Sequence, residues 1–257
     1  MKATIDASGL GEALAALDRL AGDLPGKALA DAINHTGYQA RKALHTEMAS
    51  VFDRPTPWTL KSIQLLEAKP QKLQASLWIN DYPVSKDLAP DRWLKAQVFG
   101  GPRSVKGLDV LLRAKGILPA GMFAFPAIGA RLDRYGNLSP GHIAQIKSGL
   151  KIADRAGYTG NASSSARSMA KRHAKAFFVV RRAGRPIGIG ERRDWGPGSR
   201  DKWVMVLAFG RQPKYVPRLD FHRIANEVSQ RELATNIDAA IIKALDGTLG
   251  AGYRRRR

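Results

Sequence analysis

Two long segments, one near each end of the 257-residue chain, place apolar residues at the spacing of an amphipathic helix. The apolar positions are Leu29, Ile33, Ala40, Leu44, Met48 and Val51 in residues 27–51, and Phe221, Ile224, Val228, Leu233, Ile237, Ile241 and Leu245 in residues 220–245. Each pattern lasts about seven turns. Because an amphipathic helix must bury its apolar face against another element, the chain is restricted to folds that accept two long helices.

Three further segments have the pattern of β-strands. Residues 72–80 alternate apolar and polar side chains, which is typical of a half-buried strand. Residues 176–182 and 202–209 are short and rich in aromatic and β-branched residues. The last two segments are expected to pair as an antiparallel hairpin with a long basic tip. The GRPIGIGER stretch within that tip is a candidate for one more short strand.

The middle of the chain has a different composition. Between residues 81 and 160, six prolines and the Gly100-Gly101 pair separate short apolar stretches, which predicts loops and short helices with little regular sheet. For the whole chain we predict an α+β fold: two long helices packed on a small antiparallel sheet, with an irregular, loop-rich insertion. Residues 1–82 and 161–250 would form the α+β core, residues 83–160 the insertion with short helices, and residues 251–257 a basic C-terminal tail. A short leucine-rich helix is expected over residues 10–21.

Charge is the strongest signal in the composition. The chain has 42 lysine and arginine residues against 22 aspartate and glutamate residues, a formal charge of +20. An excess of this size favours an acidic partner: nucleic acid, an anionic membrane surface or the acidic face of another protein. The absence of cysteine excludes disulfides, thiolate metal sites and cysteine nucleophiles, and is typical of proteins of the reducing cytoplasm. No stretch approaches the roughly 20 uninterrupted apolar residues that a membrane span needs.

No pattern of reactive side chains specifies an enzyme. The five histidines lack any HExxH or His-x-x-x-His spacing, and the G-x-S-x-G and Walker A motifs are absent. The most site-like stretch, GARLDRYGNLSPGHIAQI at residues 129–146, is better explained as a tight turn followed by a helix that begins at Pro140, with Ser139 as its N-cap. We therefore predict no catalytic residue, no metal site and no cofactor.

The remaining candidates for function are cationic. Lysine and arginine residues crowd into residues 171–202, interleaved with aromatic side chains, and four arginines end the chain. The candidate contacts for assembly or DNA are Lys171, Arg172, Lys175, Arg181, Arg182, Arg185, Arg192, Arg193, Arg200, Arg254, Arg255, Arg256 and Arg257. One interpretation is that these side chains bind phosphate groups. The other is that they are solvated loop charges or face acidic surfaces of a neighbouring subunit, and the residues favour neither over the other.

Several stretches resemble known phage proteins. The run GLGEALAALDRLAGDLPGKALADAINHTGYQARKALHTEMA, followed by Pro57, Thr59, Lys61 and Ile63 and then by LQASLWINDYPVS, resembles the minor tail protein Z family of tailed bacteriophages. The likeness includes a short leucine helix and a long alanine-rich helix with the step Ala32-Ile33-Asn34. The closing run YVPRLDFHRIANEVSQRELATNIDAAIIKAL is similar to the end of that family. The runs GILPAGMFAFPAIGARLDRYGNLSPGHIAQIKSGL and AFFVVRRAGRPIGIGERR resemble longer prophage proteins.

The resemblance implies a non-enzymatic virion structural protein of the tail or neck, made in the host bacterial cytoplasm. Such a protein is a subunit of a homo-oligomeric ring that completes the tail or connects it to the head. Its neighbours would be other virion proteins, such as portal, adaptor or tail tube proteins, and its basic loops would lie near packaged DNA. The family provides no catalytic residues. The alternative is a basic nucleic-acid-binding protein that acts in DNA packaging or regulation.

Overall fold

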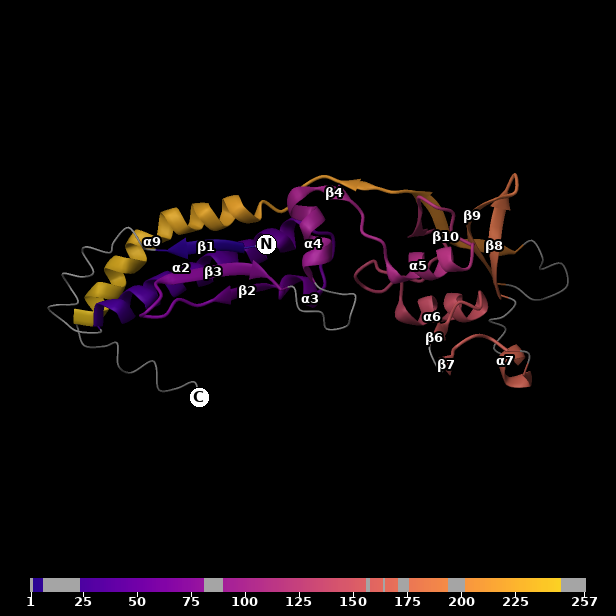
Figure 1. The fold of residues 1–257 in the computed structure, drawn as a ribbon, viewed down its shortest axis with the longest axis horizontal. Coiled ribbons are helices and arrows are strands. Elements are labelled where there is room, and N and C mark those ends of the chain that lie inside the picture. Colours follow the sequence, from indigo (N-terminus) through magenta and orange to yellow (C-terminus); the bar gives the residue numbers. More distant parts are fainter. Residues whose placement is uncertain are drawn as a thin grey trace. The chain divides into compact units, whose positions relative to one another are not determined.

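The computed structural model describes residues 2–6, 24–80, 90–155, 158–163, 165–170, 176–193 and 202–245. The chain divides into two compact units (Figure 1). Unit 1 consists of Met1–Gly101 together with Tyr215–Arg257, and unit 2 is the continuous segment Pro102–Lys214. Each unit has a hydrophobic core of its own. None of the described helices is long and apolar enough to cross a membrane.

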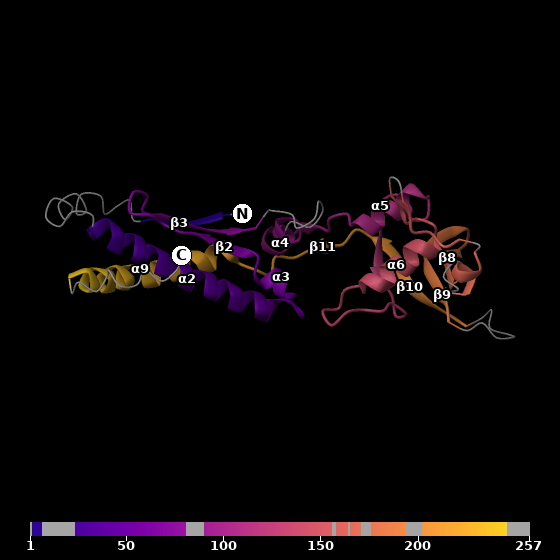
Figure 2. The same ribbon diagram turned by 90° about the horizontal axis from the view of Figure 1, so that it is seen from below.

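Unit 1 combines two long helices with a three-stranded antiparallel sheet. Helix α2 (Leu24–Val51) and helix α9 (Phe221–Leu245) pack along each other. The sheet has the order β1 (Lys2–Asp6), β3 (Gln74–Ile79), β2 (Ile63–Leu66). Figure 2 shows α9 beside α2, with the strands running along α2. Their common core includes Ile33, Leu44, Met48, Leu77, Ile79 and Phe221. Both long helices and β3 lie where the sequence pattern predicts them.

Polar side chains set the position of α2 against its neighbours. Asn34 donates from Nδ2 to the carbonyl of Ala68 at 3.1 Å and accepts from the Ala68 amide at 2.6 Å. Asn236 of α9 donates to Thr36 Oγ1 at 2.8 Å and to Gln39 Oε1 at 2.7 Å. These part-buried polar groups thereby find partners within unit 1, and the contacts favour one register of the helices.

Two short helices complete unit 1. Helix α3 (Pro57–Leu60) begins after Thr56, whose side chain accepts from the Thr59 amide, and helix α4 (Pro90–Phe99) precedes the point where the chain enters unit 2. The short strands at the two crossing points, β4 (Gly101–Pro102) and β11 (Lys214–Tyr215), pair with each other.

Unit 2 is built on a four-stranded antiparallel sheet. The order is β5 (Met122–Pro126), β10 (Trp203–Arg211), β9 (Arg185–Arg192), β8 (Phe177–Arg182). Helices α5 (Gly107–Ala114) and α6 (Pro140–Gly149) contribute Leu112 and Ile146 to its core. The smaller elements are β6 (Asp154–Arg155), β7 (Tyr158–Thr159) and helix α7 (Ala166–Ala170).

The predicted fold class is wrong. The described residues form a mixed α/β structure with seven helices, and the strands belong to separate sheets rather than to one small sheet under two long helices. Strands β8 and β10 do not pair directly, because the GRPIGIGER stretch forms the full strand β9 between them. Gly190 makes this possible: a Cβ there would meet the rings of Phe178 and Trp203 at 2.6 and 3.0 Å. Gly190 has low strand propensity but occupies a central strand, because the rings of Phe178 and Trp203 fill the space that a side chain would need.

The compact units also differ from the predicted domains. The predicted core ended at residue 82 and resumed at residue 161, whereas unit 2 extends over residues 102–214. The reason is β5, a strand from the proline-rich middle that pairs with β10 and so joins the middle segment to β8–β10 in one sheet. The expected helix at residues 10–21 and the expected tail at residues 251–257 lie outside the described residues.

Candidate functional site

The positive charge of the chain is concentrated in unit 2. Residues 102–214 contain 22 lysine and arginine residues against 6 aspartate and glutamate residues, a formal charge of +16. The remaining residues, those of unit 1, have 20 basic and 16 acidic side chains, a formal charge of +4. An acidic partner attracted by the total charge of +20 would therefore be attracted mainly to unit 2.

Three of the predicted arginines lie together at one end of the β8–β9 hairpin. Arg181 and Arg182 end β8, and Arg185 begins β9. All three side chains are exposed, and Arg182 lies directly opposite Arg185 in the antiparallel register. Directly opposite residues project to the same face of a sheet with Cβ atoms roughly 5 Å apart. The hairpin therefore projects Arg182 and Arg185 from neighbouring positions on one face of the sheet.

A tight two-residue turn sets this geometry. Ala183 and Gly184 both have positive φ, 48° and 76°, as in the turns that match the twist of a β-hairpin. Figure 1 shows the hairpin formed by β8 and β9. Arg181 Nη1 donates to the carbonyl of Gly184 at 3.1 Å, which ties that side chain back to the turn. The end of the hairpin is thus a defined structure instead of the long basic tip that the sequence predicts.

Arg192 and Arg193 lie at the opposite end of β9 and have local partners. The Arg192 guanidinium lies over the Phe178 ring, 4.9 Å from its centroid. Arg193 donates from Nη2 to the carbonyl of Gly129 at 2.8 Å, and its Nε lies 3.7 Å from Glu191 Oε2. These two arginines therefore stabilise unit 2 itself, although both remain exposed. The other candidate contacts, Lys171, Arg172, Lys175, Arg200 and Arg254 to Arg257, lie outside the described residues.

The buried Glu191 lies at the centre of a charged cluster that sequence reasoning missed. Its Oε1 accepts from Arg131 Nη2 at 2.7 Å, and its Oε2 lies 3.7 Å from His142 Nε2. The Glu191 side chain is only 9% exposed and that of His142 is fully buried. Two guanidinium groups, those of Arg131 and Arg193, face this one carboxylate, so the cluster would repel a metal cation. We infer that it joins β9, α6 and the loop before Arg131.

The hydrogen bonds of His142 define its protonation. The Arg131 amide donates to Nδ1 at 2.9 Å, so the ring proton resides on Nε2, which faces Glu191. Among the described residues, neither Nε2 nor Glu191 Oε2 has a hydrogen-bond partner. Burial lowers the pKa of His142, and the charges of Arg131 and Arg193 lower it further against the opposite effect of Glu191. His142 is therefore neutral at neutral pH.

One feature of the sequence is consistent with this cluster, although it does not identify the partners of Glu191. Glu191 is the first acidic residue after Asp154, and it stands next to Arg192 and Arg193 in a strongly basic stretch. A carboxylate in such a stretch is attracted to its basic surroundings. Its partners Arg131 and His142 are 60 and 49 positions away, which no local pattern shows.

The loop at residues 127–131 is held firmly and exposes an apolar side chain. Ala127 and Gly129 donate from their amides to the carbonyls of Val206 and Met205 at 3.0 and 2.9 Å. A Cβ on Gly129 would lie 2.6 Å from the Val204 methyl carbons, so only glycine permits this close approach. Between them, Ile128 is 96% exposed.

The stretch at residues 129–146 that looked most like a site is structural. Asp133 Oδ1 accepts from the amides of Tyr135 and Asn137, both at 2.9 Å, which makes a polar turn. Ser139 caps α6 by accepting from the His142 amide, with Pro140 at the first helical position, as predicted. Within the part of the chain that the structure describes, no group of three or more histidine and acidic side chains is placed to hold a metal ion.

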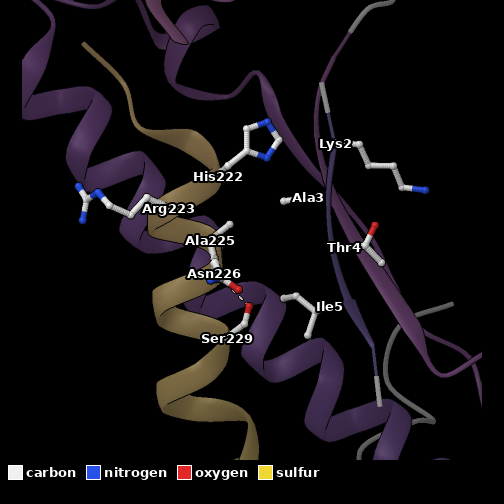
Figure 3. A pocket seen from close by; sticks show the side chains of 9 residues that line it. All are labelled: Lys2, Ala3, Thr4, Ile5, His222, Arg223, Ala225, Asn226 and Ser229. Carbon is white, nitrogen blue, oxygen red and sulfur yellow. Dashed lines mark hydrogen bonds between the residues drawn. The ribbon is translucent and has the colours of Figure 1, made fainter. Parts of the chain in front are cut away.

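A shallow pocket of about 470 Å³ lies in unit 1 between β1 and the first turns of α9 (Figure 3). His222 and Ile5 point into the space between helix and strand, whereas Lys2 and Arg223 point away from it. Arg223 is engaged by Asp220 and Glu227, each at 2.9 Å. The lining residues therefore bring no set of reactive groups together.

Comparison with known proteins adds no relative. No protein-family model matches the sequence, and no curated protein or solved structure matches it.

Proposed function

We propose that this chain is a non-enzymatic structural subunit of a tailed bacteriophage particle, acting in the tail or neck as a ring-forming tail-completion or connector protein. In this role it is made in the host cytoplasm and built into the virion. Its neighbours are copies of itself and other virion proteins, such as portal, adaptor or tail tube proteins.

The observation that carries the proposal is how the phage-like stretches divide between the two units. Those that resemble the minor tail protein Z family include α2, β3 and α9, which are far apart in the sequence and belong to unit 1. Those that resemble longer prophage proteins, residues 116–150 and 176–193, both belong to unit 2. A continuous unit inserted into another is a common result of domain insertion at an exposed loop. The division supports a tail-completion-like unit that carries an additional domain.

The distribution of charge supports the same role. A surface with a formal charge of +16 on one unit suits contact with DNA or with acidic faces of ring proteins, and such contacts need no reactive side chain. The exposed Ile128 is suited to a protein contact, because its loop is already ordered.

Mass spectrometry of purified particles tests the proposal. The chain should be present in several copies per particle after gradient purification, while a replication protein of the same phage serves as the negative control. Native mass spectrometry of the purified chain or of its subassemblies should show a closed symmetric oligomer. Detection in lysates of producing cells but never in particles would show that the chain is not a virion component.

A nucleic-acid-binding protein of DNA packaging or regulation is the second candidate, favoured by the charge of unit 2. It differs from the first in two measurable ways. A packaging or regulatory protein should be absent from mature particles, and it should bind duplex DNA with a defined site size.

A further inference from the structure

The pairing of Arg182 with Arg185 is unusual for two like charges. The two residues face each other across the β8–β9 ladder, next to a turn with two positive φ angles, and both are exposed. Like charges directly opposite each other destabilise a sheet. Neither arginine has an ion pair or hydrogen bond among the described residues, in contrast to Arg181 and Arg193.

The acidic side chains described in unit 2 are engaged elsewhere. Asp109 pairs with Arg103, Asp133 holds a turn, and Glu191 pairs with Arg131 at the far end of β9. The strand has eight residues, so that end lies on the order of 20 Å from Arg185. None of these three carboxylates therefore balances Arg182 and Arg185, and both exposed guanidinium groups are open to an anionic partner.

We propose that Arg182 and Arg185 form a phosphate-binding pair that contacts the backbone of double-stranded DNA. The planar guanidinium group presents parallel N–H donors that match phosphate oxygens. A polymer fits this end of the sheet better than a single phosphate does. Continuing the register in which Ala208 faces Gly188 places the exposed Arg211 at the same end of β10. Duplex DNA offers one negative charge per about 1.7 Å of its axis, so one molecule can engage all three arginines.

This proposal deepens the proposed function and rests on it for the source of the DNA, the packaged genome. The contact is to the backbone, so it carries no sequence preference. Binding should depend steeply on salt, because each phosphate contact releases condensed counterions.

Fluorescence anisotropy with a labelled duplex of about 20 base pairs tests the contact, using the full chain over a series of salt concentrations. The test variant is R182Q/R185Q. The control variant is R134Q/K151Q, which removes the same two charges from exposed positions of unit 2 outside the hairpin. Loss of both contacts should make the negative slope of log K against log salt shallower by about 1.8. It should also weaken binding on the order of tenfold at low salt. The control should leave the slope unchanged.

Further arms separate the alternatives. R182K/R185K keeps the charges but loses the planar donors, so it should retain the slope and bind more weakly than the wild type. Far-ultraviolet circular dichroism should show that all variants are folded. If the hairpin variant and the control variant lost equal DNA affinity, the loss would be explained by net charge alone, and the proposal would be overturned. Hairpin-dependent binding to phosphatidylserine vesicles or to inorganic phosphate without binding to DNA would also overturn it.

The outcome is independent of the particle experiment. A chain found in virions that fails to bind DNA through the hairpin would overturn the phosphate-binding pair and leave the structural role intact. A chain that binds DNA through the hairpin but is absent from particles would overturn the structural role and favour the packaging or regulatory protein.

Discussion

Single side chains explain why unit 1 holds its long helix in one position. The Asn34 amide makes both hydrogen bonds that a neighbouring peptide group would make, and its partner is the backbone of Ala68. Ala32 and Ile33 beside it are 2% and 0% exposed. The Ala32-Ile33-Asn34 step, which the sequence analysis noted only because it resembles a phage protein family, therefore has two structural roles. Ala32 and Ile33 pack in the core, and Asn34 bonds to the backbone of a residue 34 positions away.

In unit 2 the corresponding role belongs to the buried ion pair of Arg103 and Asp109. Their atoms Nη2 and Oδ2 lie 3.2 Å apart, with side chains 7% and 1% exposed. Asp109 also accepts from the amides of Lys106 and Ala124, which joins α5 to β5. The Arg103 guanidinium lies over the rings of Phe123 and Phe125, 5.1 Å from each centroid.

Replacing Asp109 by asparagine should destabilise the protein strongly. The change leaves the buried Arg103 charge without a counterion, which costs about 3–5 kcal/mol in comparable cases. Urea denaturation followed by circular dichroism measures the loss. Asp53→Asn is the matched control, because Asp53 pairs with Arg54 at the exposed surface and its replacement should have little effect on stability. Equal effects of the two substitutions would contradict the role given to the buried pair.

His142 should make stability depend on acid pH. Its pKa in the folded protein is lowered, by burial first and then by the charge of Arg131. The unfolded chain, with an ordinary histidine pKa of about 6.5, therefore binds more protons than the folded one as the pH falls below that value. Stability should accordingly be lost on acidification from about pH 6.5, and His142 should contribute no pH dependence above it.

The comparison that isolates this effect uses His142→Asn, whose Oδ1 can still accept from the Arg131 amide. Free energies of unfolding measured in urea between about pH 5 and about pH 7.5 should fall less steeply on the acid side for the variant than for the wild type. Parallel pH profiles would show that His142 does not titrate differently in the folded and unfolded states.

Among the elements, α6 has the clearest local determinants. Ser139 accepts from the His142 amide at 3.3 Å, and Pro140 occupies the first turn, where a missing amide proton has no consequence. The start of this helix can be predicted from the sequence because the N-cap Ser139 and Pro140 are adjacent residues.

Ser139→Ala should therefore destabilise the protein by about 1 kcal/mol, the usual effect of losing an N-cap. Thermal unfolding or urea denaturation can resolve a change of this size. Ser139→Thr, which keeps the hydroxyl oxygen, is the rescue control and should recover most of the loss. An alanine variant as stable as the wild type would mean that the cap makes no net contribution.

Strand β9 is the element that local reasoning undervalued. Three of its eight residues are Gly188, Gly190 and Pro186, all with low strand propensity. Its position is decided by its neighbours: a Cβ on Gly188 would lie 2.3 Å from the Leu207 carbonyl, and rings cover Gly190. The glycines that weaken the strand in isolation are required by the sheet.

At the scale of the whole molecule, the two units divide core and charge between them. Unit 1 is assembled from both ends of the chain, whereas unit 2 is continuous and carries most of the positive charge. The cores contain no residue in common. Each unit should therefore unfold as a cooperative structure of its own.

Calorimetry of the full chain should show two thermal transitions. The fragment of residues 102–214, expressed alone, should unfold cooperatively near one of them, because its core is complete. The fragment of residues 1–101 should not fold alone, because Leu219, Phe221 and Val228 of its core are missing. If the full chain unfolded in a single transition and neither fragment unfolded cooperatively, the two units would not be independent folding units.

The local patterns of the chain predicted the elements that depend on near neighbours. The periodicity of apolar residues located α2 and α9, alternation located β3, and the Ser139-Pro140 pair located the start of α6. The wrong fold class came from assigning β8 and β10 to the sheet of the long helices. Strand patterns show which face is buried but not which strand lies beside it, since pairing is decided by contacts far along the chain.

The positions of the long helices, the capped turn at Ser139 and the large positive charge could be predicted from local patterns, because these features depend on composition and on spacings of a few residues. The division of the charge between the units, the contacts of the buried Glu191 with Arg131 and His142, and the position of Arg182 opposite Arg185 became visible in the folded protein alone. Burial and strand register arise from residues that lie tens of positions apart in the sequence and meet only on folding, so no local pattern encodes them.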